Sequence, residues 1–375
     1  MSRKPGKVRV AVVFGGRSAE HAISCVSAGS VMAALDPERY EVVPVGIATD
    51  GRWVLADPDQ RLAITDGKLP EVVGGTAVSL VGDPAGRGLA VLEPSAAVGP
   101  ALTEVDVVFP VLHGAYGEDG TIQGLLELAN IPYVGAGVLA SAVGMDKAIM
   151  KVVFAARGLP VCPYRVVLRA DWERQQDETL KNLERALGFP MFVKPANLGS
   201  SVGISKAKDA VSLREAMVLA GSFDRKIVVE AAVPEAREIE CGVLGNDDPE
   251  ASVAGEVVPS REFYDYEAKY LDAASEVIIP ADLPVAVSND IRRLAIEAFK
   301  AIDGAGMARV DFLLSRADAR IYVNEVNTIP GFTTISMYAK LWAASGVPYS
   351  GLVDRLIQLA TARHAEKQQL RTSVT

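Results

Sequence analysis

The sequence predicts a mixed α/β protein whose N-terminal unit is built on an open, mostly parallel sheet. Three observations predict this class: a run of β-branched apolar residues, a glycine pair that breaks the run, and helical spacing after the pair. They occupy Val8–Phe14, Gly15-Gly16 and Ala19–Leu35, and a second strand-like run follows at Val42–Ile47. Apolar runs of this kind are typical of parallel strands that are covered on both faces. Ligands of such sheets bind beyond the carboxyl ends of the strands, where the glycine pair lies.

The rest of the first unit is expected to extend to residue 144. Residues 50–104 are rich in Gly, Pro and Asp, which predicts an elaborated insertion. After it we expect a strand, a polar loop, a helix and a short strand: 105–112, 113–120, 124–128 and 132–134.

Two further units follow, with predicted boundaries 145–237 and 238–375. The second unit opens on a helix at Met145-Asp146-Lys147 and contains a glycine-rich loop between two strands, 189–195 and 226–233. In the third unit we expect a strand, a long polar loop, a helix and two adjacent strands: 238–244, 259–275, 288–302, 307–314 and 320–327. A chain of 375 residues suits such a division, because single cores stop growing at about 250–300 residues.

Composition narrows the class of protein. Apolar residues make up 49% of the chain and charged residues 23%, the balance of a soluble globular protein. The formal net charge of -9, without a block of like charges, argues against nucleic acid as a partner. No apolar run reaches about 18 residues, which argues against a membrane-spanning helix. Three widely spaced cysteines, Cys25, Cys162 and Cys241, indicate a reducing compartment, and we expect the cytoplasm.

Two adjacent strands of the third unit, ARVDFLL and IYVNEVN, carry charged residues inside apolar runs. Side chains alternate faces along a strand, so Arg309 shares a face with Asp311, and Glu325 shares a face with Asn327. Carboxylate and amide oxygens suit Mg²⁺ that is held partly by substrate phosphates. Buried charges without partners are costly, which favours a metal site on Asp311, Glu325 and Asn327 over a solvated surface hairpin.

The register of this hairpin decides whether the acidic groups converge. A turn at 315–319 would place Asp311 opposite Val323, with Glu325 as its diagonal neighbour on the same face. A slip of one residue would send the two carboxylates to opposite faces. We expect the register that brings them together.

A second signal is a strand that ends in a lysine and leads into a loop rich in glycine and serine. The stretch is FVKPANLGSSVG, in which Lys194 ends the strand and Ser200 and Ser201 lie between two glycines. Glycines let backbone N–H groups approach phosphate oxygens closely, and serine hydroxyls add donors. No Walker motif occurs in the chain. A linker or a hairpin would explain the loop equally well, so the phosphate role depends mainly on Lys194.

Two residues near the strand ends of the first unit have ordinary structural explanations. Glu20 lies near the start of the first helix, where a carboxylate complements the helix dipole, although it could also receive a substrate ammonium group. His113, in the segment LHG, could be a hydrogen-bonded turn residue. On pattern alone, we favour the structural role for both.

Taken together, the chain resembles the D-alanine–D-alanine ligases, a family of the ATP-grasp superfamily. The matching stretches run in order from Val13 to Ser336: VFGGRSAEHAIS, PVLHGAYGEDGTIQG, GVLASAVGMDK, FVKPANLGSSVGIS, FYDYEAKY, ARVDF and NEVNTIPGFTTIS. The resemblance implies three α/β domains, in which a two-domain ATP-grasp module follows the N-terminal domain and grips ATP. It also implies a homodimer formed largely through the N-terminal domain.

The resemblance further implies a reaction. The enzymes of this family join two D-alanine molecules through a D-alanyl phosphate and make a peptidoglycan precursor. ATP and Mg²⁺ are the implied cofactors, with two metal ions and with Mn²⁺ as a substitute.

Residue by residue, the family pattern implies roles for the nucleotide side of the site. The metal ligands fall on the same trio that spacing indicates, Asp311, Glu325 and Asn327. Lys147 and Lys194 match the phosphate lysines, and Ser200 and Ser201 lie in the loop over the phosphates. Glu230 matches the acid that holds the nucleotide, and Ala231 and Val233 lie on the segment that contacts adenine. Glu238 matches the acid that binds the ribose. The stretch before Glu238 is one residue longer than the pattern, which makes that match weaker.

For the amino-acid side, the pattern reverses both structural interpretations. Glu20 matches the acid that binds the ammonium group of the first D-alanine, and His113 matches a substrate-site histidine. Arg309 and the amide of Gly331 match the groups that stabilise the oxyanion. Contacts to the second D-alanine match Lys269, Ser336 and Met337. Tyr270 lies on the covering loop, 259–275, and is a candidate proton relay with Ser200.

Other functions remain open. Relatives that make a D-alanine–D-lactate ester carry histidine in place of this tyrosine, so Tyr270 favours the dipeptide. A different amino-acid pair is a second alternative. A nucleotide-binding sensor without activity is a third, but the chain retains the metal carboxylates and phosphate lysines that such a protein would be expected to lose.

Overall fold

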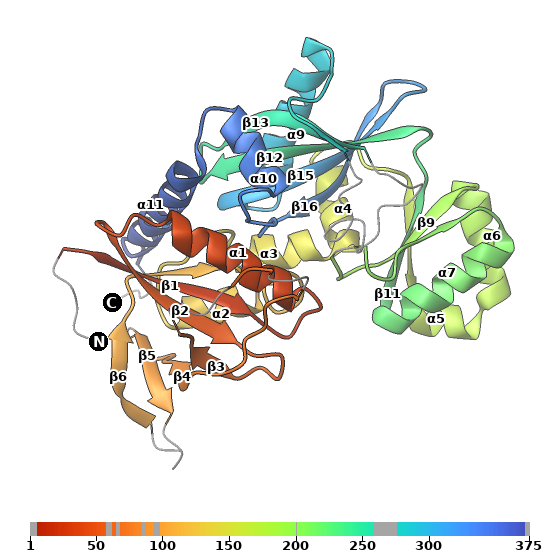
Figure 1. Cartoon of the computed structure of the whole chain (residues 1–375). Coiled ribbons are helices and arrows are strands. Elements are labelled where there is room, and N and C mark those ends of the chain that lie inside the picture. The colour runs from red at the N-terminus through yellow and green to blue at the C-terminus, as the bar shows by residue number, and fades with distance from the viewer. Residues whose placement is uncertain are drawn as a thin grey trace.

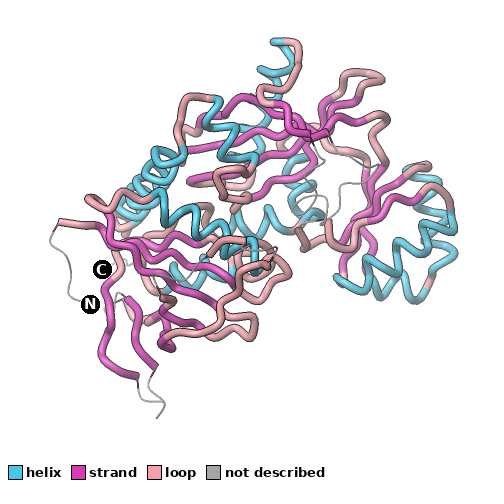
Figure 2. Tube along the Cα trace, viewed as in Figure 1, coloured by secondary structure: helices cyan, strands magenta, loops and turns pink. Residues whose placement is uncertain are grey.

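A computed structural model describes residues 6–57, 62–64, 68–84, 88–92, 98–199, 201–258 and 276–371. Figures 1 and 2 show three sheets with flanking helices, and the smallest sheet and its helices stand apart from the other two. The three-unit α/β architecture is confirmed, whereas the boundaries after residues 144 and 237 stay predictions. Within the described part of the chain, none of the helices is long and apolar enough to cross a membrane.

The N-terminal sheet has seven strands in the order β6-β5-β4-β3-β2-β1-β7. Their bounds are Val8–Gly15 (β1), Tyr40–Ile47 (β2), Trp53–Leu55 (β3), Thr76–Leu80 (β4), Gly88–Leu92 (β5), Val98–Glu104 (β6) and Val107–Pro110 (β7). Only the β2–β1–β7 part is parallel, and β2 to β6 pair antiparallel. The expectation of a mostly parallel sheet is therefore wrong for its outer half. The supposed insertion forms strands that continue the sheet, because short turns allow antiparallel neighbours without a crossover helix.

The predicted glycine turn ends β1 and leads into α1 (His21–Ala34). Gly15 has φ +87°, and a Cβ there would lie 2.3 Å from the carbonyl oxygen of Ile47. This position therefore requires glycine, both for its left-handed backbone and for the close approach of β2. A second helix, α2 (Thr121–Leu128), follows the predicted polar loop.

The central lobe, residues 164–231, contains a four-stranded antiparallel sheet in the order β10-β9-β11-β8. Its strands are Tyr164–Leu168 (β8), Met191–Pro195 (β9), Ser205–Ala207 (β10) and Lys226–Ala231 (β11), and its helices are Arg169–Arg174 (α5), Gln176–Leu187 (α6) and Ala210–Phe223 (α7). Trp172, Leu183, Met191 and Leu213 belong to an apolar core made only of residues from this lobe.

The third sheet has the order β14-β13-β12-β15-β16. Its strands are Ala236–Gly245 (β12), Glu250–Val258 (β13), Glu276–Ile278 (β14), Gly306–Ser315 (β15) and Ile321–Asn327 (β16). The remaining helices are Val138–Met145 (α3), Lys147–Ala156 (α4), Val285–Ala301 (α9), Met337–Ala344 (α10) and Tyr349–Lys367 (α11). Met150 and Phe154 of α4 pack with Ile291 and Phe299 of α9, so α4 is part of the core of this sheet.

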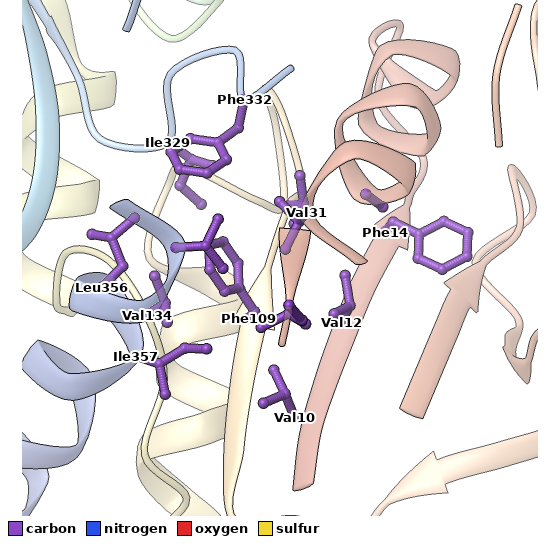
Figure 3. Packing of buried hydrophobic residues seen from close by; sticks show 14 of the residues in the cluster. Val10, Val12, Phe14, Val31, Phe109, Val134, Ile329, Phe332, Leu356 and Ile357 are labelled. Carbon is purple, nitrogen blue, oxygen red and sulfur yellow. The ribbon is translucent and has the colours of Figure 1, made fainter. Parts of the chain in front are cut away.

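One continuous core joins the N-terminal sheet to the C-terminal elements (Figure 3). Phe109 of β7 and Phe332, in the segment after β16, are buried with ring centroids 5.8 Å apart. Val10 and Val12 of β1 and Leu356 of α11 belong to the same cluster. The segment after β16 is therefore fixed against the N-terminal sheet.

The β15–β16 hairpin differs from the predicted register. Phe312, and not Asp311, lies opposite Val323, and a bulge between Asp311 and Phe312 then places Asp311 directly opposite Glu325. Near the turn, the strands pair one residue away from the predicted register. Asn324 is the extra residue of the bulge, and it returns Asp311 and Glu325 to the same face of the hairpin. The prediction that the two acids converge is confirmed, although they are directly opposed and not diagonal neighbours.

Candidate active site

Two carboxylates face each other across the β15–β16 hairpin. Asp311 pairs with Glu325, and Arg309 pairs with Asn327. Like charges directly opposite each other are destabilising unless a cation lies between or beside them. Arg309 supplies one such charge: its Nε and one terminal nitrogen each donate to Asp311 at 2.7 Å. Its Nε also lies 2.8 Å from Glu240 Oε2, so the guanidinium is shared between two acids.

Helix α4 places a lysine against the second carboxylate. The carboxylate of Asp146 caps the helix by accepting from the amides of Ala148 and Ile149, both at 3.1 Å. Lys147, the first helical residue, donates to the carbonyl oxygen of Leu198 at 2.6 Å, and its Nζ lies 3.5 Å from Glu325 Oε2. Lys147 therefore joins the glycine-rich loop to the acidic hairpin.

Lys194, at the end of β9, contacts a buried acid on the neighbouring strand. Its Nζ donates to Glu230 Oε2 at 2.8 Å and to Asn324 Oδ1, the bulge residue, at 3.2 Å. Burial would raise the pKa of Glu230, but the charges of Lys151 and Lys194 outweigh it and hold the pKa at about 2. Glu230 is therefore ionised although it is 2% exposed.

The glycine-rich loop after β9 approaches the N-terminal unit. A Cβ on Gly199 would lie 3.5 Å from Glu20 Oε2, and one on Gly203 would lie 2.7 Å from the ring of Phe223. Ser201 has a φ of +58°, in the left-handed region that non-glycine residues rarely adopt. The loop therefore begins near Glu20 of the first unit, at Gly199, and ends packed against Phe223, at Gly203.

A cavity lies between the central lobe and the third sheet. Most residues predicted for phosphate, nucleotide and metal contacts line its wall: Lys147, Lys194, Ser201, Glu230, Ala231, Val233, Glu238, Asp311 and Glu325. The third predicted metal ligand, Asn327, does not. Phe192, Ile239 and Leu313 add apolar surface to the same wall. A wall that carries both charged and apolar groups suits a ligand with phosphates and a flat base.

A second group of polar residues lies at the ends of β1 and β7. Ser18 donates to the carbonyl oxygen of His113 at 2.7 Å, and the amide of Glu20 donates to the Ser18 hydroxyl at 3.2 Å. Glu20 is 8% exposed, and a Cβ on Gly114 would lie 2.7 Å from its Oε2. Gly114 is thus the residue that lets the histidine loop pass beside this acid.

The segment after β16 is hydrogen-bonded to this second group. His113 places Nδ1 3.0 Å from the carbonyl oxygen of Ile329 and Nε2 3.0 Å from Ser27 Oγ. Burial lowers the pKa of His113, so the ring is neutral. The amide of Ile329 donates to Glu118 Oε1 at 3.0 Å. Both backbone groups of Ile329 are therefore held by side chains of the first unit.

Comparison with known proteins decides the family. The model for the N-terminus of D-ala D-ala ligases matches residues 9–136, and the model for their C-terminus matches residues 153–358. A D-alanine--D-alanine ligase of Mycobacterium sp. (strain KMS) is 55% identical over 368 residues, which covers 95% of this chain and 97% of that protein. The chain belongs to the D-alanine–D-alanine ligase family.

Solved structures of the family agree over almost the whole chain. The D-alanine-D-alanine ligase from Coxiella burnetii superposes with a TM-score of 0.78 at 35% identity and covers 97% of each chain. The VanG D-Ala:D-Ser ligase from Enterococcus faecalis has a TM-score of 0.81 at 31% identity and covers 94% of this chain and 99% of that one. D-alanine–D-alanine ligases have the ATP-grasp fold and use ATP and Mg²⁺.

The hairpin suits the divalent cation that the family uses. Among the described residues, no group of three His, Cys, Asp or Glu side chains could hold a metal ion. The third oxygen would therefore come from Asn327, whose amide nitrogen lies 3.0 Å from Asp311 Oδ2. Two opposed carboxylates and an amide form an all-oxygen set, as Mg²⁺ prefers. The donor set fits, and the assignment of these three residues as ligands stays a prediction.

Of the residues assigned to the oxyanion and the second substrate, Arg309 lies on β15, and Gly331, Ser336 and Met337 follow β16 in the chain. Gly331 belongs to the segment after β16, and a Cβ there would lie 3.3 Å from Ser336 Oγ. Ser336 precedes α10, and Met337 is its first residue. Ser200, Lys269 and Tyr270, and with them the expected covering loop 259–275, lie outside the described residues.

Three residues of this site were not predicted from the sequence. Lys151 is buried beside Glu230, Asn324 forms the bulge next to Lys194, and Glu118 accepts from the amides of Gly114 and Ile329. Burial and the neighbouring Glu20 raise the pKa of Glu118 to about 8. Glu118 lies inside the motif HGAYGEDG, which was predicted only as a polar loop.

Proposed function

We propose that this protein joins two D-alanine molecules into D-alanyl-D-alanine, a peptidoglycan precursor, through a D-alanyl phosphate formed with ATP. The observation that carries the proposal is the cavity wall on which two lysines, Glu230 and the opposed pair Asp311 and Glu325 meet. The 55% identity to a D-alanine--D-alanine ligase over most of the chain supports it.

In the first step, a carboxylate oxygen of D-alanine attacks the γ-phosphorus of ATP, the bond to ADP breaks, and an acyl phosphate forms. We assign Lys147 and Lys194 to the phosphates, since both residues line the cavity. Glu230 and Glu238 hold the nucleotide in this assignment. Asp311, Glu325 and Asn327 would hold Mg²⁺, which when bound neutralises charge on the transferring phosphoryl group.

In the second step, the neutral amine of a second D-alanine attacks the acyl carbon, a carbon–nitrogen bond forms, and phosphate leaves. We assign Glu20 to the ammonium group of the first D-alanine and Arg309 with the Gly331 amide to the oxyanion. Neighbouring acids raise the pKa of Arg309 against the effect of burial, so its positive charge is secure. His113, Lys269, Ser336 and Met337 are the assigned substrate contacts. For the proton that the incoming ammonium group must lose, we keep the relay that the resemblance implies, Tyr270 with Ser200.

Further properties belong to the same proposal. We propose two bound Mg²⁺ ions, for which Mn²⁺ can substitute, because a pair of opposed carboxylates can serve two cations. We also propose a homodimer formed through the N-terminal unit and a cytoplasmic location. Neither nucleic acid nor a membrane is expected as a partner.

Incubation with ATP, Mg²⁺ and D-alanine tests the proposal. We expect equal amounts of ADP, phosphate and D-alanyl-D-alanine. A panel that replaces the second substrate with D-serine, D-lactate and L-alanine measures which partner is used, and this matters because a D-Ala:D-Ser ligase shares the fold at 31% identity. Nucleotide binding without phosphate release would contradict the proposal and favour a sensor.

A further inference from the structure

Helix α4 carries two lysines with different surroundings. Lys147 and Lys151 are four residues apart, so they lie on one face of the helix. Lys147 lines the cavity, whereas Lys151 does not and has no exposed surface, at 0%. The Nζ of Lys151 lies 3.0 Å from Glu230 Oε1, and neither atom makes a hydrogen bond to another described group. Glu230 is therefore the acidic partner of the buried Lys151 ammonium group.

The Glu230 carboxylate is thus shared between two lysines that differ in their access to a ligand. Lys194 contacts Glu230 Oε2 and Asn324, and its side chain borders the cavity. A phosphate bound there would compete with Glu230 for Lys194. Lys151 cannot reach such a ligand, so its charge stays with Glu230. A buried carboxylate that lost both partners would be strongly destabilised.

We propose that Lys151 is a positioning residue for the nucleotide, which keeps Glu230 ionised and directed into the cavity when Lys194 binds phosphate. An ionised carboxylate can only accept hydrogen bonds. The donors that ATP or ADP offers are the amino group of adenine and the ribose hydroxyls. The inference depends on the proposed nucleotide site and assigns a new residue to it.

The charges around Glu230 give the sign of the expected pH effect. The titratable groups beside Glu230 are Lys151, Cys162, Tyr164 and Lys194. The cavity wall adds Lys147, Glu238, Glu240, Asp311 and Glu325. Burial raises the pKa values of the Cys162 thiol and the Tyr164 hydroxyl, so both are neutral at neutral pH. Lys151 and Lys194 are the positive charges that offset burial of Glu230. Removing Lys151 will therefore raise the pKa of Glu230.

Binding of ADP with Mg²⁺, measured by calorimetry on the full chain, tests the inference without requiring turnover. Lys151→Met should weaken binding at neutral pH by at least about tenfold. Binding should weaken further as the pH falls through the raised pKa of Glu230, a step that the wild-type profile lacks. The KM of D-alanine should change much less than the KM of ATP. Unchanged binding and an unchanged pH profile would overturn the inference.

Lys226→Met is the matched control. Lys226 forms an ion pair with Asp146, which joins the same strand, β11, to the residue that caps α4, and neither residue lines the cavity. It should affect stability but neither ADP affinity nor its pH profile. Equal losses of affinity in both variants would mean that Lys151 only ties α4 to β11, and the positioning role would be wrong.

A double variant covers the case in which Lys151→Met does not fold. Lys151→Met with Glu230→Gln leaves no unpaired carboxylate, and its ADP binding should equal that of Glu230→Gln alone and be independent of pH. If the double variant bound ADP more than about threefold more weakly than Glu230→Gln, Lys151 would act by a route other than Glu230. If wild-type protein bound ADP but formed no dipeptide, only the proposed function would be contradicted.

Discussion

The two sides of the site are built differently. The amino-acid side lies on a core common to the N-terminal sheet and the C-terminal elements, in which Phe109 and Phe332 pack together. The nucleotide side is completed by the central lobe, whose core contains none of those residues. Its helices and strands pack mainly against one another. A small apolar cluster links the lobe to α4, through Ala148, Ala196 and Val228.

Charged contacts complete the attachment of the central lobe. Lys194 and Glu230 of the lobe reach Asn324 of β16 and Lys151 of α4. Interfaces of this polar kind allow relative motion more readily than a common apolar core. The difference supports the proposal that a stable framework holds the two D-alanine molecules, whereas the nucleotide binds between two bodies with separate cores. Breaking one side should leave the other largely intact.

Truncating each core gives the largest expected effect. Phe332→Ala should lower the free energy of unfolding of the common core by about 3–5 kcal/mol, and Leu213→Ala should lower that of the central lobe by about 2–5 kcal/mol. Trp342 lies in the first core and Trp172 in the second, so each can report its own region. Urea unfolding, followed with one tryptophan kept and the other two replaced by phenylalanine, measures both.

We expect Leu213→Ala to shift only the Trp172 transition and Phe332→Ala to shift mainly the Trp342 transition. If Leu213→Ala moved both transitions equally, the lobe would not be an independent unit. The same variants should separate in function: Phe332→Ala should raise the KM of D-alanine, and Leu213→Ala the KM of ATP.

Acid should weaken the contact between the lobe and α4. The pKa of Glu230 falls from 4.5 to about 2 on folding, which corresponds to a stabilisation on the order of 3 kcal/mol. Because the folded pKa is depressed, this stabilisation is present above about pH 4.5 and is lost as the pH falls towards 2. Glu230→Gln should thus be less stable than wild type at neutral pH, and the difference should shrink on acidification. Glu184→Gln, at an exposed position on α6, is the control, and a constant difference for Glu230→Gln would refute the linkage.

Glu325→Ala tests the β15–β16 hairpin, which lines the cavity between the third sheet and the central lobe. We expect turnover to fall by about a hundredfold, or about 2.7 kcal/mol, with little change in the unfolding transition, because the site and not the core needs this charge. Asp318→Ala, at the exposed tip of the same hairpin, should retain normal turnover. Near-normal dipeptide synthesis by Glu325→Ala would show that the metal assignment is wrong.

Local pattern predicted the parts of the fold in which one segment suffices. The apolar run of β1, the glycine turn after it and the acidic strands β15 and β16 all lie where the sequence places them. Strand pairing was harder to predict from the sequence. Residues 50–104 carry no signal that distinguishes an insertion from the edge strands of a sheet. Strand spacing predicted Asp311, Glu325 and Asn327 as metal ligands, and the strand that ends before a glycine-rich loop predicted Lys194. The roles assigned to Glu20 and His113 came from the family resemblance.

Residues that act through distant partners escaped prediction. Lys151 resembles any helical lysine until β11 brings Glu230 to it, and Glu118 acts through the amide of Ile329, which is 211 residues away. The β-bulge depends on how the two strands pair with their neighbours, which hairpin spacing does not reveal.

Asn324 offers the smallest and most local test of the comparison. The bulge makes Asn324 the extra residue of β16, and its Oδ1 accepts from Lys194, the lobe lysine that borders the cavity. Asn324→Ala removes one acceptor for a charged donor, so the KM of ATP should rise about three- to tenfold while kcat stays nearly constant. Asn324→Asp keeps the oxygen and should keep the affinity. A loss of turnover at unchanged KM would mean that the bulge serves the carboxylates, by setting Asp311 opposite Glu325, rather than the contact between β16 and the central lobe.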